Sequence, residues 1–142
     1  MKVTVKLTIN EIKAIHTSFM AMTDEKLNIQ LWNKVYDIIE ELERHLVSVG
    51  NKEKELRERL LKEYSNDVES EECQSQFQVG MELILNKKVD ITIDEDSVIS
   101  IDQFQDIKNV EITGRDFINI RVFCKLISSE LNSNKEKSET DL

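Results

Sequence analysis

The segment TDEKLNIQLWNKVYDIIEELERHLVSVGNKEKELRERLLKEY, residues 23–64, is the strongest structural signal in this chain. It runs for 42 residues with no proline and with one glycine, Gly50. Because proline interrupts helices and glycine disfavours them, this composition predicts one long helix. Thr23 and Asp24, which are favoured N-cap residues, are its expected start.

The predicted helix carries a seam of side chains at alternating spacings of four and three residues, the heptad pattern of helices that pack along their length. Beyond Val49 the seam becomes polar, with Lys52 and Arg59 at seam positions. That second half is supported instead by favourable pairs four residues apart, such as Glu53–Arg57. The residues expected to make contacts are Leu31, Val35, Ile38, Leu42, His45 and Val49.

The predicted helix is too long for a compact domain to cover. Its 42 residues span roughly 60 Å, whereas a domain of this size has a diameter under about 45 Å. Either the helix bends back near Gly50, or part of its seam is exposed and meets another chain. We favour a continuous helix with a weak point at Gly50. A homodimer through residues 31–49 is then the simplest arrangement of partners.

The rest of the chain predicts an α+β fold with a small, mostly antiparallel sheet of the N-terminal strand and C-terminal strands. Alternating apolar residues predict strands at 2–9, 89–94 and 98–101, the last two as a hairpin. Helical spacing predicts helices at 10–22 (capped by Asn10), 74–86 and 117–131, the last opening with a capping-box-like Thr113 to Asp116. The remaining expectations are a loop at 65–73, a helical turn at 102–107 and a short strand at 110–112.

The composition fits a single α+β domain, residues 1–131, followed by a flexible polar tail, residues 132–142. The net charge is −9, and the whole acidic excess lies in residues 65–142. Binding to nucleic acid or to an anionic membrane needs a basic surface, so we expect neither partner. A basic protein partner, or solubility alone, would explain the acidic half.

The sequence carries no export or membrane signal. It has no apolar run of about 18 residues, and its N-terminus alternates where a signal peptide would be continuously apolar. Cys73 and Cys124 are therefore expected to be reduced thiols in the cytosol.

Residues with potential chemistry are scattered. His16 and His45 lie on different predicted helices, and neither has a cysteine or a second histidine nearby to complete a zinc site. The acidic run from Asp90 fails the EF-hand pattern, with Glu95 where the loop needs glycine. We expect no catalytic, cofactor-binding or metal-binding residue, and a protein that is not an enzyme. His45, at a seam position, is a hypothetical pH-sensitive element of helix pairing.

Three segments carry a family resemblance: LRERLLKEYSNDV (56–68), FQVGMELILNKKVDITID (77–94) and ISIDQFQDIKNVEIT (99–113), followed by a closing helix. In this order they resemble a family of small uncharacterised proteins of tailed phages and prophages. The resemblance spans residues 1–131 and departs at Gly114, where that family often has proline. It implies a phage or prophage origin, so the cytosol expected above is the host cytoplasm. It implies no functional residues, because the function of the family is unknown.

These observations together predict a non-catalytic protein that acts through protein–protein interaction. The first version is a self-associating protein, a homodimer, with a role in virion assembly or an accessory role. The alternative is a small acidic effector that binds and modulates a host protein, for example one with a basic nucleic-acid site. An enzyme of unknown class is the third reading.

Overall fold

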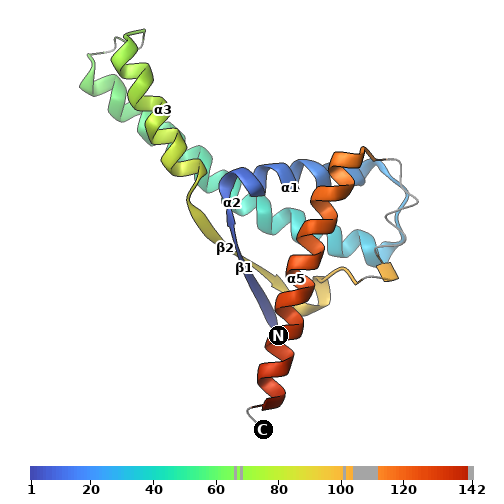
Figure 1. The fold of residues 1–142 in the computed structure, drawn as a ribbon. Coiled ribbons are helices and arrows are strands. Elements are labelled where there is room, and N and C mark those ends of the chain that lie inside the picture. The colour runs from blue at the N-terminus through green and yellow to red at the C-terminus, as the bar shows by residue number, and fades with distance from the viewer. Residues whose placement is uncertain (66, 68, 101, 104–111, 141–142) are drawn as a thin grey trace.

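The computed structural model describes residues 1–65, 67, 69–100, 102–103 and 112–140. Within that part of the chain the fold is α+β, with four α-helices and one two-stranded antiparallel sheet, which confirms the predicted class (Figure 1). The elements are β1 (Lys2–Thr8), α1 (Ile9–Ala21), the 3₁₀ turn η1 (Met22–Asp24), α2 (Ile29–Glu63), α3 (Glu71–Leu85), β2 (Lys88–Asp94), the 3₁₀ turn η2 (Glu95–Ser97) and α5 (Gly114–Thr140).

The sheet joins the beginning of the chain to its middle. β1 pairs antiparallel with β2, and the register places Val3 opposite Ile93 and Val5 opposite Ile91. These side chains form the buried face, as expected for strands with period two. The predicted hairpin of β2 with residues 98–101 is wrong, because residues 98–100 form no strand and β1 pairs with β2 instead.

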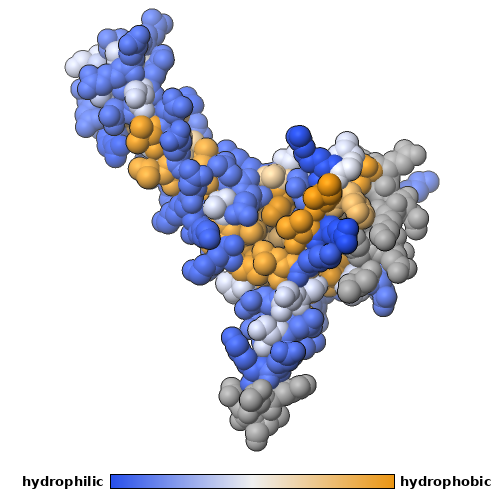
Figure 2. All heavy atoms as spheres, viewed as in Figure 1, coloured by the Kyte–Doolittle hydropathy of each residue, from blue (hydrophilic) through white to orange (hydrophobic). Residues whose placement is uncertain are grey.

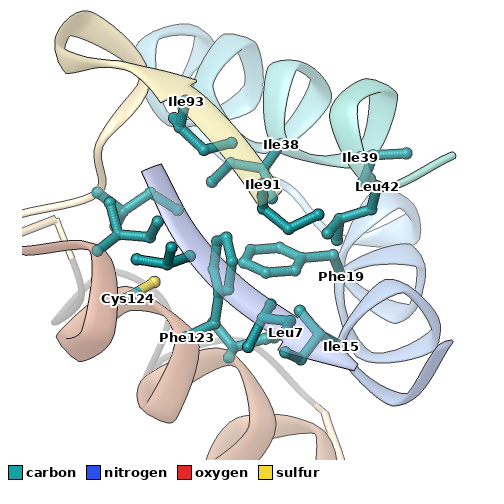
Figure 3. Close-up of a cluster of buried hydrophobic side chains, with 14 of the residues drawn as sticks. Leu7, Ile15, Phe19, Ile38, Ile39, Leu42, Ile91, Ile93, Phe123 and Cys124 are labelled. Atoms are coloured by element: carbon teal, nitrogen blue, oxygen red, sulfur yellow. The ribbon is translucent and has the colours of Figure 1, made fainter. Parts of the chain in front are cut away.

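The main core lies between this sheet and the helices α1, α2 and α5 (Figure 3). Phe19 of α1 and Phe123 of α5 meet edge to face, with ring centroids 5.6 Å apart. Ile38 and Leu42 of α2 pack toward Ile91 of β2. An isolated two-stranded sheet is marginal in water, so its stability depends on the helices that cover its apolar face.

The long helix is continuous through Gly50, as predicted, and α2 contains 35 residues. It starts later than expected, at Ile29. Asn28 is the N-cap, and its side-chain oxygen accepts a 2.8 Å hydrogen bond from the backbone N–H of Leu31. Thr23 and Asp24 lie in the preceding 3₁₀ turn instead of capping α2. The shorter helix reduces, but does not remove, the excess length.

Part of that excess length is covered within the chain by a helical hairpin. The first half of α2 packs on the body, meaning the sheet, α1 and α5, and α3 folds back along the second half (Figure 1). Residues 53–63 of α2 and α3 form a projecting arm (Figure 1), and the C-terminal end of α3, at Ile84 and Leu85, packs against the main core. The small apolar cluster of the arm contains Leu56, Leu60 and Cys73. Gly80 lets the two helices approach, since a Cβ there would lie 2.7 Å from Leu56 Cδ2.

Several element ends also differ from the prediction. Thr8, not Asn10, caps α1, in a capping box with Glu11. Ser70 caps α3, so the predicted loop at 65–73 ends three residues early. α5 runs on to Thr140 through residues for which we expected a flexible tail. Of the helical turn predicted at 102–107, residues 102–103 are helical, while residues 104–107 lie outside the described part of the chain. Strand residues 110–111 also lie outside it, and Ile112 is not in a strand.

Candidate interaction surfaces

The predicted contact seam lies inside the protein. Its five apolar residues are all buried, with at most 5% of each exposed. They pack against the sheet and the neighbouring helices of the same chain. The heptad pattern therefore identified true contacts, but these contacts are internal. The apolar seam residues are Leu31, Val35, Ile38, Leu42 and Val49.

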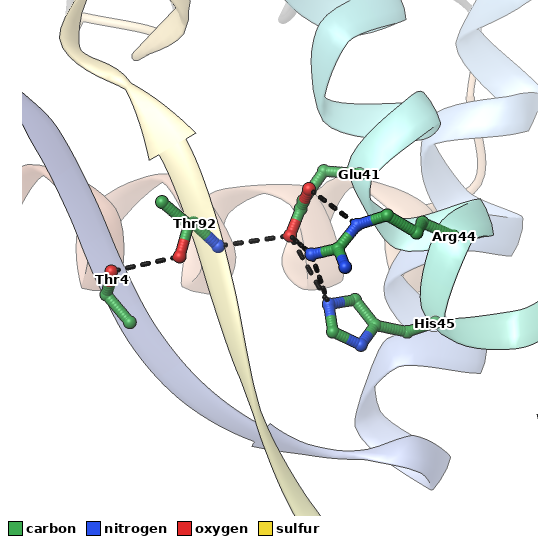
Figure 4. A network of polar contacts seen from close by, with 5 residues as sticks. All are labelled: Thr4, Glu41, Arg44, His45 and Thr92. Atoms are coloured by element: carbon green, nitrogen blue, oxygen red, sulfur yellow. Dashed lines mark hydrogen bonds and ion pairs between the residues drawn. The ribbon is translucent and has the colours of Figure 1, made fainter. Parts of the chain in front are cut away.

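The sixth seam residue, His45, belongs to a polar network that ties α2 to β2 (Figure 4). Glu41 Oε1 is its centre. It accepts hydrogen bonds from Arg44 Nη2 at 2.8 Å and from the backbone N–H of Thr92 at 3.2 Å, and it lies 3.3 Å from His45 Nε2. On the other side of the strand, the hydroxyls of Thr92 and Thr4 are 3.0 Å apart. Glu41 thus accepts a hydrogen bond from a backbone N–H on the edge of β2 that does not pair with β1.

The network also sets the charge state of Glu41. Burial alone would raise the pKa of its carboxyl group, but the hydrogen bonds from Arg44, Thr92 and His45 outweigh burial. The net result is a pKa lowered from its usual value of 4.5, which keeps the carboxylate ionised at neutral pH. The role of this network is to hold the helix against the sheet.

The remaining candidate reactive groups are not brought together. His16 lies 3.1 Å from Glu43, away from His45 and its partner Glu41. Burial raises the pKa of the Cys124 thiol to about 12, so this cysteine is a packing residue. Among the described residues, no three His, Cys, Asp or Glu side chains are placed to hold a metal ion.

A polar groove of about 500 Å³ runs between α2 and β2. Asp37, Glu40 and Asp94 give it an acidic lining, with Arg44 as its basic residue. Asp37 is held in place by a 2.7 Å hydrogen bond from the Ser97 hydroxyl. The groove therefore combines Asp94, from the acidic second half of the chain, with the carboxylates of Asp37 and Glu40 on α2.

A second hollow, of about 300 Å³, lies on the arm and is mainly apolar. Leu60, Leu61 and Phe77 line it. The Arg57 guanidinium lies over the Phe77 ring, 5.0 Å from its centroid, and also pairs with Glu53 at 2.9 Å. The predicted Glu53–Arg57 pair is therefore confirmed.

In the second half of the chain, α3 and α5 each expose apolar side chains at a spacing of four residues. On α5, Ile118, Val122 and Leu126 follow one another at intervals of four residues on the face opposite the core, and 59% of Val122 is exposed. On α3, Val79 and Leu83 have the same spacing, and 72% of Leu83 is exposed. Figure 2 shows apolar surface over the body where α5 lies and a smaller apolar patch along the arm.

These two stripes escaped the sequence prediction. The helical period of residues 117–131 predicts their core face, and Ile118, Val122 and Leu126 lie on the opposite face. Their spacing of four residues was the available signal, because it also places side chains on one line of a helix.

No described helix is both long enough and apolar enough to cross a membrane. Comparison with known proteins gives no match to any family model, to any curated protein or to any solved structure.

Proposed function

We propose that this protein is non-catalytic and acts by protein–protein interaction, including self-association, in the biology of a phage or prophage. The observation that carries the proposal is the pair of exposed apolar stripes on α3 and α5. Large exposed apolar patches on soluble proteins mark interaction sites. The phage context rests on the resemblance of residues 1–131 alone.

The arm adds support for this function. It extends the molecule by two helices yet buries only a small cluster around Leu56 and Leu60. An extension of this kind adds little to the core and much to the surface available for contacts. The apolar residues of the α2 seam are not available for a homodimer interface, because they are covered by their own chain.

Light scattering after size exclusion tests the proposal directly. Over a range of concentrations, the protein is expected to reach a mass of at least twice its 16.6 kDa chain mass. A mass of one chain at every concentration would remove self-association from the proposal. Mass spectrometry of purified virions, compared with the infected-cell lysate, would then separate an assembly role from a role outside the particle.

The acidic groove favours a second candidate, an effector that binds a basic host protein. Asp37, Glu40 and Asp94 face this groove, and matched positive charge on a partner would be attracted to it. The triple change of these three residues to Asn, Gln and Asn should then abolish capture of the basic partner. Unchanged capture would eliminate the groove as its binding site.

A further inference from the structure

The two exposed stripes have opposite electrostatic surroundings. On α5, the apolar line is flanked by Arg115, Arg121 and Lys125, all exposed. On α3, which contains three glutamates and no basic residue, Glu82 is exposed next to Leu83. In a chain with a net charge of −9, the basic face of α5 is an exception.

The charged residues beside the stripes are not already engaged. Neither Arg121 nor Lys125 forms an ion pair with another residue in the described part of the chain. The same holds for Glu82 within those residues. Charges left at the rim of an apolar stripe steer and orient a complementary surface.

From this complementarity we propose that the arm of one molecule docks on α5 of a second copy, with Val79 and Leu83 packing on the α5 stripe. Glu82 then lies near Lys125 or Arg121 of the partner copy. The match rests on two helices that each present apolar residues four apart, the spacing that lets ridges of one helix pack against those of another. The inference specifies the surfaces used in the self-association proposed above and rests on that function.

The position of the arm explains why the contact forms between molecules. The arm points away from the body, whereas α5 crosses the body (Figure 1). A second copy related by a two-fold axis can place its own arm on α5 while receiving the first arm in return. This reciprocal exchange closes the assembly as a dimer with two equal contacts.

Two single substitutions, one on each surface, test the proposed contact. Leu83→Asp on the arm and Val122→Asp on α5 place a carboxylate in the proposed apolar contact. Both sites are exposed, so each variant should keep the helical circular dichroism of the wild type. Each should raise the dimer dissociation constant at least about tenfold. Val47→Asp is the control, since Val47 is exposed on α2 outside both stripes and its change should leave the dimer intact.

Mixing the two variants identifies which surfaces meet. The Val122→Asp chain retains a normal arm, and the Leu83→Asp chain retains a normal α5, so a mixed dimer regains one of its two contacts. We expect mixing to restore dimers that neither variant forms alone at the same concentration. If α5 paired with α5, or arm with arm, every mixed contact would contain a carboxylate and mixing would restore nothing.

Charge exchange provides an independent check. Glu82→Lys and Lys125→Glu should each weaken the dimer, and the double variant should recover most of the affinity because each contact regains opposite charges. Additive weakening in the double variant would overturn the pairing.

The outcomes separate this inference from the broader function. A wild-type dimer that is insensitive to Leu83→Asp and Val122→Asp would refute the arm-to-α5 contact and leave self-association standing. A wild-type monomer would refute both. A monomer that sediments with phosphatidylserine vesicles, and loses this on Val122→Asp, would assign the basic apolar face of α5 to a membrane surface instead.

Discussion

Ser18 is fully buried where α1 meets α5, and its hydroxyl is surrounded by polar atoms. The oxygen lies 2.9 Å from Asp116 Oδ1 and accepts a 3.0 Å hydrogen bond from Asn119 Nδ2. Asp116 in turn accepts a hydrogen bond from the Thr113 hydroxyl, and its backbone N–H donates to that hydroxyl, at the start of α5. One small side chain therefore links the first helix to the cap of the last.

Replacing Ser18 with alanine should lower the free energy of unfolding by about 1–3 kcal/mol, because the polar groups of Asp116 and Asn119 lose a buried partner. Urea denaturation followed by circular dichroism measures this change. Thr17→Ala is the control, since Thr17 is exposed at the neighbouring position of the same helix and its hydroxyl donates to the Lys13 carbonyl of its own helix. Its effect should stay within about 0.5 kcal/mol. Equal effects of the two substitutions would contradict the linking role of Ser18.

Glu41 makes stability depend on pH in the acid range. Its folded-state pKa is lowered from 4.5, so the native state favours the carboxylate more than the unfolded chain does. This contribution is fully present above the unfolded pKa and is lost as the pH falls through the folded pKa.

The Glu41→Gln variant should be less stable than the wild type at pH 7, by about 1 kcal/mol, and the difference should shrink as the pH falls below the usual carboxyl pKa of 4.5. Urea midpoints measured across this pH range give the result. Glu40→Gln, at an exposed neighbouring position, should show no such convergence. A stability difference that is constant with pH would mean that the carboxylate charge of Glu41 does not matter.

Two helical glycines, Gly50 on α2 and Gly80 on α3, allow the effect of an added Cβ on stability to be compared. A Cβ at Gly50 meets nothing within 4 Å, whereas a Cβ at Gly80 lies 2.7 Å from Leu56 Cδ2. Gly50→Ala should therefore stabilise the protein by about 0.5–1 kcal/mol, the usual gain for removing a glycine from a helix.

Gly80→Ala should lack that gain and should loosen the arm, because the Leu56 side chain has to leave its place in the arm cluster. Thermal unfolding measures the first substitution, and amide hydrogen exchange within α3 measures the second. An equal gain in stability from both alanines would show that α2 and α3 are not packed closely at Gly80.

The elements that the sequence predicted well are those defined by local periodicity. The existence of one long helix and its continuity through Gly50 followed from composition and spacing alone, whereas its start at Ile29 did not. The cap of α1 could also be predicted, since Thr8 followed by Glu11 is a capping-box pattern. The apolar alternation of β1 continues through Ile9, however, and this placed the predicted start of the helix too late.

Which strands and helices contact one another could not be predicted from local periodicity. β2 is followed at once by a turn and apolar residues, which favours a hairpin, yet its true partner is β1, more than 80 residues earlier. The seam on α2 shows that side chains are buried without showing what buries them. For the same reason, exposed stripes on α3 and α5 became visible only once the core was assigned.

Body and arm differ in how much holds them together. Phe19, Phe123 and the sheet belong to the large core of the body, while the arm cluster buries Leu56, Leu60 and Cys73. Segments with few buried apolar contacts open locally at a free energy well below that of global unfolding. The arm should therefore open on its own.

Native-state hydrogen exchange should show weaker protection in α3 than in α1 or the first half of α2. Leu60→Ala should reduce protection in the arm and leave the body unchanged, whereas Leu42→Ala should destabilise the protein globally by about 2–5 kcal/mol. If Leu60→Ala lowered protection in α1 as much as in α3, arm and body would form one cooperative unit.

The pairing of β1 with β2 also has a consequence during protein synthesis. β1 and α1 are made before β2 and α5, so their apolar sides are completely covered only when β2 and then Phe123 of α5 have been made. At about 5–20 residues per second, that interval is on the order of ten seconds. The two helices of the arm are neighbours in the sequence, so they can pack together before β1 has paired with β2. The nascent chain thus presents its finished arm before it has a finished body, and its exposed first strand is the segment most in need of a chaperone.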